Sequence, residues 1–106
     1  MKVNFQRLTL VTNKGHLSVQ EYIKFIGLCV KAGVTAVQLR EKLLPYEDLR
    51  YFGQLLKTFL DLNNIPLIIN DNIDLCLQLD ASGVHLGQTD GDPVKARSML
   101  GPDKII

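Results

Sequence analysis

Short apolar segments alternate with longer segments of mixed polarity along this chain. Residues 7–12, 35–40, 66–70 and 83–86 are brief runs rich in aliphatic and β-branched side chains. Runs of this length, bounded by turn residues, are typical of strands buried in a parallel sheet. Residues 104–106 repeat the pattern and predict the opening of a fifth strand.

The segments between these strands have the spacing of amphipathic helices. Ser18 and Glu21 form a capping-box pattern, and Tyr22 and Ile26 follow at helical intervals until Gly33 ends the segment. Three further helices are predicted, from Pro45 to about Asn63 and Asn64, over about residues 72–79, and from Asp92 and Pro93 to Gly101 and Pro102.

Regular alternation of strands and helices indicates parallel βαβ units, and two architectures of this kind are common: an open doubly wound sheet and a closed barrel. The turn after the first strand reads TNKGHLS and lacks the GxGxxG pattern of dinucleotide-binding sheets. A complete barrel needs about 250 residues. We therefore expect an α/β fold, the N-terminal half of a TIM (β/α)8 barrel, with about four βα units and the start of a fifth strand. Residues 1–106 would form a single domain, truncated from a longer barrel.

Composition narrows the class of protein. The chain is 46% hydrophobic and 22% charged, with a formal net charge of +1, so no overall field attracts nucleic acid or an anionic membrane. The sequence contains neither a signal-peptide pattern nor a membrane-spanning apolar run. We expect a cytoplasmic protein with no nucleic-acid or membrane partner. Cys29 and Cys76 lie in apolar helical segments, without a CxxC pattern, and are predicted to be buried thiols.

Polar residues at the carboxyl ends of the strands are the first candidates for chemistry, because ligands bind at that edge of parallel α/β folds. After the second strand, alternation places Gln38, Arg40 and Lys42 on one side and Glu41 on the other. An arginine fork beside a lysine suits a diphosphate or another polyanion. The alternative interpretation is a solvated loop with a salt bridge to Glu41 or Glu47.

The third and fourth strands end in residues that suit a metal. Asn70 and Asp71 close the third strand, and Asp90 follows the fourth on the same edge. One or two carboxylates, together with phosphate oxygens, are the usual ligands of Mg²⁺. The alternative for Asp71 is to cap the next helix, a role that Asn72 could fill equally well. For His85 we favour a structural hydrogen-bonding role over that of a base.

Three motifs occur in one order: QLREK at residues 38–42, IIND at 68–71 and GVHLGQTD at 83–90. Together, and with these separations, they resemble the thiamine phosphate synthase family, which includes thiazole tautomerases. The resemblance implies a TIM barrel that joins hydroxymethylpyrimidine diphosphate to a thiazole phosphate and releases pyrophosphate. It covers the whole chain but about half of the family's usual length.

The resemblance also implies roles for individual residues. No covalent nucleophile is required, and His85 and Gln88 would support the site from the end of their strand. The implied substrate-binding residues are Gln38, Arg40, Glu41, Lys42 and Asn70, and the implied Mg²⁺ ligands are Asp71 and Asp90.

The family's thiazole phosphate site comes from the second half of the barrel, which has no counterpart in these residues. A half barrel leaves edge strands and apolar faces open. We therefore expect a homo-oligomer or a complementing second half. A thiazole tautomerase and a non-catalytic binding or assembly module are the alternative functions. Arg40, Lys42, Asp71 and Asp90 favour the synthase, because a tautomerase does not need the diphosphate.

Overall fold

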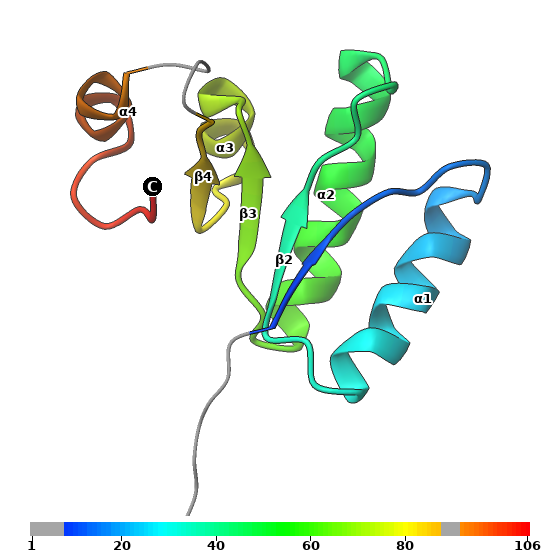
Figure 1. The fold of residues 1–106 in the computed structure, drawn as a ribbon. Helices are drawn as coiled ribbons and strands as arrows, with labels where there is room; N and C mark the ends of the chain where they lie inside the picture. The colour runs from blue at the N-terminus through cyan, green and yellow to red at the C-terminus, as the bar shows by residue number, and fades with distance from the viewer. Residues whose placement is uncertain (1–7, 88–91) are drawn as a thin grey trace, which may run out of the picture.

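The computed structural model describes residues 8–87 and 92–106 of the chain, and within them four strands alternate with four helices (Figure 1). The predicted elements are present, with ends that differ by one or two residues from those expected. Their bounds are β1 Thr9–Val11, α1 Val19–Lys31, β2 Ala36–Leu39, α2 Tyr46–Leu62, β3 Leu67–Asn70, α3 Ile73–Leu79, β4 Gly83–His85 and α4 Pro93–Leu100.

The strands form one parallel sheet in the order β1-β2-β3-β4. Each strand therefore lies beside the strand that precedes it in the chain. A doubly wound sheet reverses its strand order at a switch point, whereas a barrel adds every new strand on the same side. The order of the described strands is that of a barrel. Ile105 forms a parallel bridge with Gly83, which confirms the predicted start of a fifth strand beside β4.

The two faces of the sheet differ in burial. Val37, Leu39, Leu67, Ile69 and Val84 point toward the helices and are at most 2% exposed. The alternate positions, which we call the open face, are only half-buried or exposed; they include Val11, Gln38, Ile68, Asn70 and His85. The helices thus cover one face of the sheet, as they do on the outside of a barrel (Figure 1).

Helix α2 supplies the centre of the core. Its residues Phe52, Leu56 and Leu60 are fully buried and lie in one cluster with Ile26 of α1 and Leu75 of α3. The three α2 side chains recur every four residues, so they form a single stripe along one side of the helix that packs in the core. The core therefore packs against the helix-covered face of the sheet and leaves the carboxyl ends of the strands accessible.

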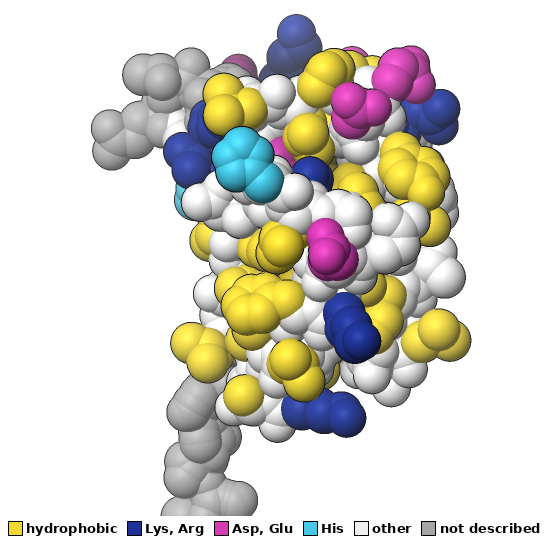
Figure 2. All heavy atoms as spheres, turned by 90° about the vertical axis from the view of Figure 1, so that its right-hand side faces the viewer, with side chains coloured by type: hydrophobic (Ala, Val, Ile, Leu, Met, Phe, Trp, Pro, Cys, Tyr) yellow, Lys and Arg dark blue, Asp and Glu magenta, His cyan; other side chains and the backbone are white. Residues whose placement is uncertain are grey.

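The outer surface of α1 and α2 carries several exposed apolar side chains. Figure 2 shows hydrophobic side chains over this face of the molecule. Phe25, Leu28 and Tyr51 are 45%, 63% and 54% exposed. In barrels, neighbouring helices pack side by side around the sheet, so an apolar flank of this kind suits a further helix.

The predicted helix starts are confirmed by their hydrogen bonds. Ser18 Oγ accepts from the Glu21 amide at 3.0 Å, and the Glu21 carboxylate accepts from the Ser18 amide at 2.9 Å. Asp92 caps α4 by accepting from the Val94 amide at 2.9 Å. Because all the described strands are parallel, the loops that lead from a strand into the next helix lie at one edge of the sheet.

The two thiols differ, contrary to the sequence-based expectation. Cys76 is fully buried, but Cys29 is only partly buried because it lies at the side of α1 rather than on its core stripe. The prediction was therefore right for Cys76 and wrong for Cys29.

In the described part of the chain, no helix has the length and hydropathy that a membrane span requires.

Candidate functional site

The register of the sheet aligns residues from three motifs. Leu39 pairs with Ile69, and Asn70 pairs with His85. Arg40 is the next residue after Leu39, so Arg40, Asn70 and His85 follow one row across the carboxyl ends of β2, β3 and β4. Because Leu39 points toward the helices, alternation directs the row to the open face.

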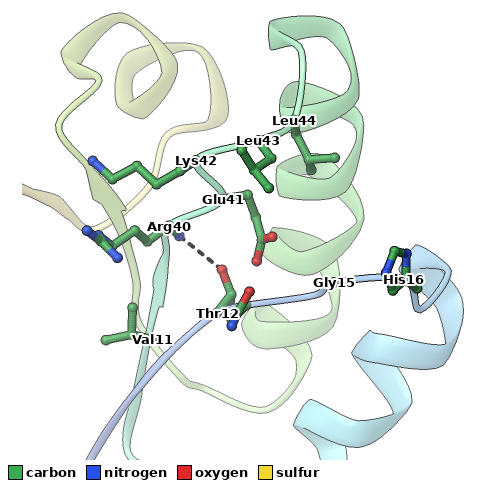
Figure 3. Close-up of a pocket in the computed structure, with 10 residues that line it drawn as sticks. Val11, Thr12, Gly15, His16, Arg40, Glu41, Lys42, Leu43 and Leu44 are labelled. Atoms are coloured by element: carbon green, nitrogen blue, oxygen red, sulfur yellow. Dashed lines mark hydrogen bonds between the residues drawn. The ribbon is translucent and has the colours of Figure 1, made fainter.

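Arg40 and Lys42 extend their side chains toward the same side, away from α2, and Glu41 points in the other direction (Figure 3). Both cations are exposed. Within residues 8–87 and 92–106, the ion pairs are Arg50–Glu47, Lys57–Asp61 and Lys104–Asp80. The alternative of a salt bridge to Glu41 or Glu47 is therefore wrong among the described residues, and two cationic heads remain available for an anion.

Glu41 has a partner in the loop between β1 and α1. Its carboxylate oxygens accept from the backbone N–H of Lys14 at 2.9 and 3.1 Å. The expected separation of Glu41 from Gln38, Arg40 and Lys42 is thus confirmed. In this arrangement the carboxylate holds the loop, and contact between Glu41 and a substrate stays a prediction.

Thr12 is a residue of the site that sequence reasoning missed. It is 2% exposed; its amide donates to the Gln38 carbonyl oxygen at 2.9 Å, and its hydroxyl accepts from the Arg40 amide at 2.9 Å. The available signal was a hydroxyl side chain at the carboxyl end of the first strand, directly after Leu10 and Val11. Thr12 therefore connects the end of β1 to the cationic segment that follows β2.

Tyr22 holds the same loop from α1. Its hydroxyl accepts from the Asn13 amide at 2.9 Å. Burial raises the pKa of Tyr22, and the hydrogen bond from Asn13 partly offsets that increase. The raised pKa favours the neutral phenol, whose oxygen accepts the Asn13 hydrogen bond that holds the loop.

A hollow of about 450 Å³ lies between this loop and the segment after β2 (Figure 3). A smaller one of about 220 Å³ lies between the ends of β2 and β3. Arg40 and Lys42 line both hollows, and Asn70 and Asp71 line the smaller one. The structure thus brings five of the predicted site residues around the smaller hollow at the carboxyl edge, because Glu41 lines it as well. Gln38 lies one row below them on β2.

Asp71 occupies a strained backbone position. Its φ is +72°, and the amide of the following residue, Asn72, donates back to the Asn70 carbonyl oxygen at 2.8 Å. A hydrogen bond between residues two apart around a positive φ defines an uncommon, strained γ-turn. Asn72, rather than Asp71, caps α3 by accepting from the Leu75 amide at 2.9 Å. The helix-cap alternative is therefore confirmed for Asn72 and wrong for Asp71.

The Asp71 carboxylate is exposed and accepts no hydrogen bond within the described residues. Asp90, the second predicted metal ligand, lies outside the described residues, and so does Gln88. Over the described ranges, no group of three or more His, Cys, Asp or Glu side chains gathers as a metal site. Mg²⁺ shared with phosphate needs only one or two carboxylates, so the exposed Asp71 carboxylate fits that ion when the oxygens of a phosphate supply further ligands.

Comparison with known proteins decides the family. The model of the thiamine monophosphate synthase family matches residues 8–106. The chain belongs to this family. Thiamine-phosphate synthase from Chlamydia abortus is 58% identical over 106 residues, which is 100% of this chain and 50% of that protein. The protein of the same name from Clostridium acetobutylicum is 46% identical over 100 residues, which is 94% of this chain and 47% of that one.

A solved structure is similar to this chain over the same share of its length. Thiamine phosphate pyrophosphorylase from Pyrococcus furiosus superposes with a TM-score of 0.78 at 25% identity, covering 93% of this chain and 47% of that one. The chain spans about half the length of the curated relatives it matches. The predicted fold, the N-terminal half of the family's (β/α)8 barrel, is therefore confirmed.

Proposed function

We propose that this chain supplies the diphosphate- and Mg²⁺-binding half of a thiamine phosphate synthase. The complete enzyme would condense hydroxymethylpyrimidine diphosphate with a thiazole phosphate and release pyrophosphate. One observation supports the proposal most: Arg40 and Lys42 extend together over the open face, unpaired within the described residues, in line with Asn70.

The reaction breaks the bond between the pyrimidine methylene carbon and a diphosphate oxygen. Negative charge then grows on the leaving diphosphate, and preorganised cations stabilise that charge more than they stabilise the bound substrate. Arg40 would bind two phosphate oxygens through its planar fork, and Lys42 would add a mobile point charge. The bond to the thiazole nitrogen forms at the same carbon, so the protein needs no nucleophile of its own.

Asn70 and Gln38 would orient the substrate rather than carry charge. Asn70 follows Arg40 in the row across the strands, and its amide offers both a donor and an acceptor. Gln38 lies one row deeper on β2. These amides suit the polar edge of the pyrimidine, and the charged row above them suits the diphosphate.

Asp71 would hold Mg²⁺ together with Asp90. When bound, the ion would neutralise part of the diphosphate charge as a Lewis acid. The strained turn supports this role for Asp71, because uncommon backbone conformations concentrate at functional sites.

The open face and the apolar flank of α1 would be covered by the other half of the barrel, which would also carry the thiazole phosphate site. Val11 and Ile105 are 45% and 53% exposed on or beside the sheet. A second copy of this chain is the alternative cover. The predicted oligomerisation and the cytoplasmic location stay predictions.

Titration calorimetry with hydroxymethylpyrimidine diphosphate and Mg²⁺ tests the proposal. We expect Mg²⁺-dependent binding that Arg40→Ala weakens at least about tenfold, because the bidentate contact is lost. Lys31→Ala is the control, since it removes an exposed charge from the last turn of α1, at the opposite edge. If the diphosphate does not bind, or if both variants bind alike, the site assignment fails. A thiamine phosphate assay then separates the synthase from a non-catalytic module.

A further inference from the structure

We propose that Thr12 is a positioning residue for Arg40 in the diphosphate site. This inference rests on the proposed function, because it assigns Thr12 a role in binding an anion. Thr12 would not touch the diphosphate itself. It would act through the backbone of Arg40, which its hydroxyl binds at 2.9 Å.

The register shows what is unusual about this contact. Val11 pairs with Gln38, and the Thr12 amide donates to the Gln38 carbonyl oxygen. In a regular parallel ladder the next bond would run from the Arg40 amide to the Thr12 carbonyl oxygen. Here the Arg40 amide bonds to the Thr12 side-chain oxygen instead. The hydroxyl therefore replaces a main-chain acceptor one residue beyond the last paired position.

Glu41 makes a parallel substitution at the next step. A continued ladder would pair the Lys14 amide with the Arg40 carbonyl oxygen, but the Lys14 amide donates to the Glu41 carboxylate at 2.9 and 3.1 Å. Two side chains thus extend the connection between β1 and β2 beyond the point where the strands diverge. The divergence leaves room for the 450 Å³ hollow, which Thr12 and Arg40 both line.

This geometry has a consequence for binding. Arg40 lies outside β2, so no strand bond of its own amide fixes it. The buried Thr12 hydroxyl supplies that restraint and sets where the long side chain begins. A preorganised cation loses less freedom when the anion binds, so removal of the hydroxyl should weaken diphosphate binding without removing any charge.

The test measures the Kd of inorganic pyrophosphate in the presence of Mg²⁺, with the free energy of unfolding measured alongside. Thr12→Val keeps the side-chain shape and removes the acceptor, and we expect about tenfold weaker binding, the scale of one hydrogen bond. Thr12→Ser keeps the hydroxyl and should bind within about twofold of the wild type. If Thr12→Val does not fold, Thr12→Ala takes its place with the same expected loss.

Thr35→Val is the matched control. Thr35 Oγ1 accepts from the Leu8 amide at 2.8 Å, so it joins β1 and β2 by the same kind of bond at the opposite edge of the sheet. Both Thr12→Val and Thr35→Val should lower the free energy of unfolding, but only Thr12→Val should weaken pyrophosphate binding. Equal binding by Thr12→Val and the wild type would overturn the inference.

A double-mutant cycle shows whether Thr12 acts through Arg40. In an Arg40→Ala background, Thr12→Val should weaken pyrophosphate binding by less than about twofold, because the cation it positions is gone. The same tenfold loss in both backgrounds would refute the inference. If the wild type itself binds no pyrophosphate, both the proposed function and the positioning role fail. If the wild type binds pyrophosphate and Thr12→Val binds it equally well, only the positioning role fails and the proposed function stands.

Discussion

The backbone amide of Asp71 donates to the carbonyl oxygen of His85 at 2.8 Å. This bond continues the pairing of Asn70 with His85 and joins the ends of β3 and β4. The chain then reverses, since the next amide bonds back to Asn70. Asp71 is thus held at a positive φ by bonds on both sides, and the residue is exposed.

The first prediction separates the backbone role of Asp71 from its charge. Asn adopts positive φ about as readily as Asp, so Asp71→Asn should change the free energy of unfolding by less than about 0.5 kcal/mol. Under the proposed function it should weaken Mg²⁺-dependent pyrophosphate binding at least about tenfold. Asp71→Val, which disfavours positive φ, should cost about 1–3 kcal/mol. Unchanged binding by Asp71→Asn would exclude this carboxylate as a metal ligand.

The second prediction concerns acid stability. The Ser18 backbone and hydroxyl hydrogen bonds lower the pKa of Glu21. Its contribution to stability is therefore present above the carboxyl pKa of the unfolded chain and is lost as the pH falls through the lower folded pKa. Urea unfolding should show Glu21→Gln to be less stable than the wild type at neutral pH and equal to it in strong acid. A gap that persists in acid would contradict the pKa shift.

A comparison variant tests the other half of this capping box. Ser18→Ala removes the hydroxyl that accepts from the Glu21 amide. It should cost about 1 kcal/mol at neutral pH. No loss would show that water replaces the cap.

The third prediction concerns Gly83. A methyl group there would overlap the carbonyl oxygen of Ile105, with which Gly83 is bridged. Gly83→Ala should therefore destabilise the chain by about 1–3 kcal/mol, the range for overpacked positions. Ser82→Ala, in the preceding residue, makes no such contact and should stay within about 0.5 kcal/mol. Equal unfolding free energies for the two variants would show that the start of the fifth strand does not pack on β4.

The fourth prediction concerns the two thiols. The Cys76 thiol is buried, and burial raises its pKa. Cys29, in contrast, is partly accessible to solvent. Alkylation followed by mass spectrometry should label Cys29 in the folded protein and Cys76 only in urea. Cys29→Ser should abolish labelling of the folded chain. Rapid labelling of Cys76 without urea would mean that α3 opens locally.

Sequence patterns were sufficient for the elements and for placing the candidate site residues at the carboxyl edge of the sheet. Helix starts such as Ser18 with Glu21 depend on groups three residues apart, and the strands depend on short apolar runs. Both interactions are local, so they can be recognised without knowing the fold. The direction of Glu41 away from Arg40 and Lys42 followed from alternation alone.

The tertiary structure decided which partner each polar group takes. Arg40 meets Thr12 across 28 residues and Glu41 meets Lys14 across 27, and neither contact has a local signature. The choice between Asp71 and Asn72 as helix cap also depended on the bond from Asp71 to His85 on the next strand. Such contacts are set by the register of the strands and by where they diverge. The sequence by itself therefore determined the elements, their order and the edge with the candidate residues, while long-range hydrogen bonds decided which polar side chains bind the backbone of neighbouring segments and which stay exposed.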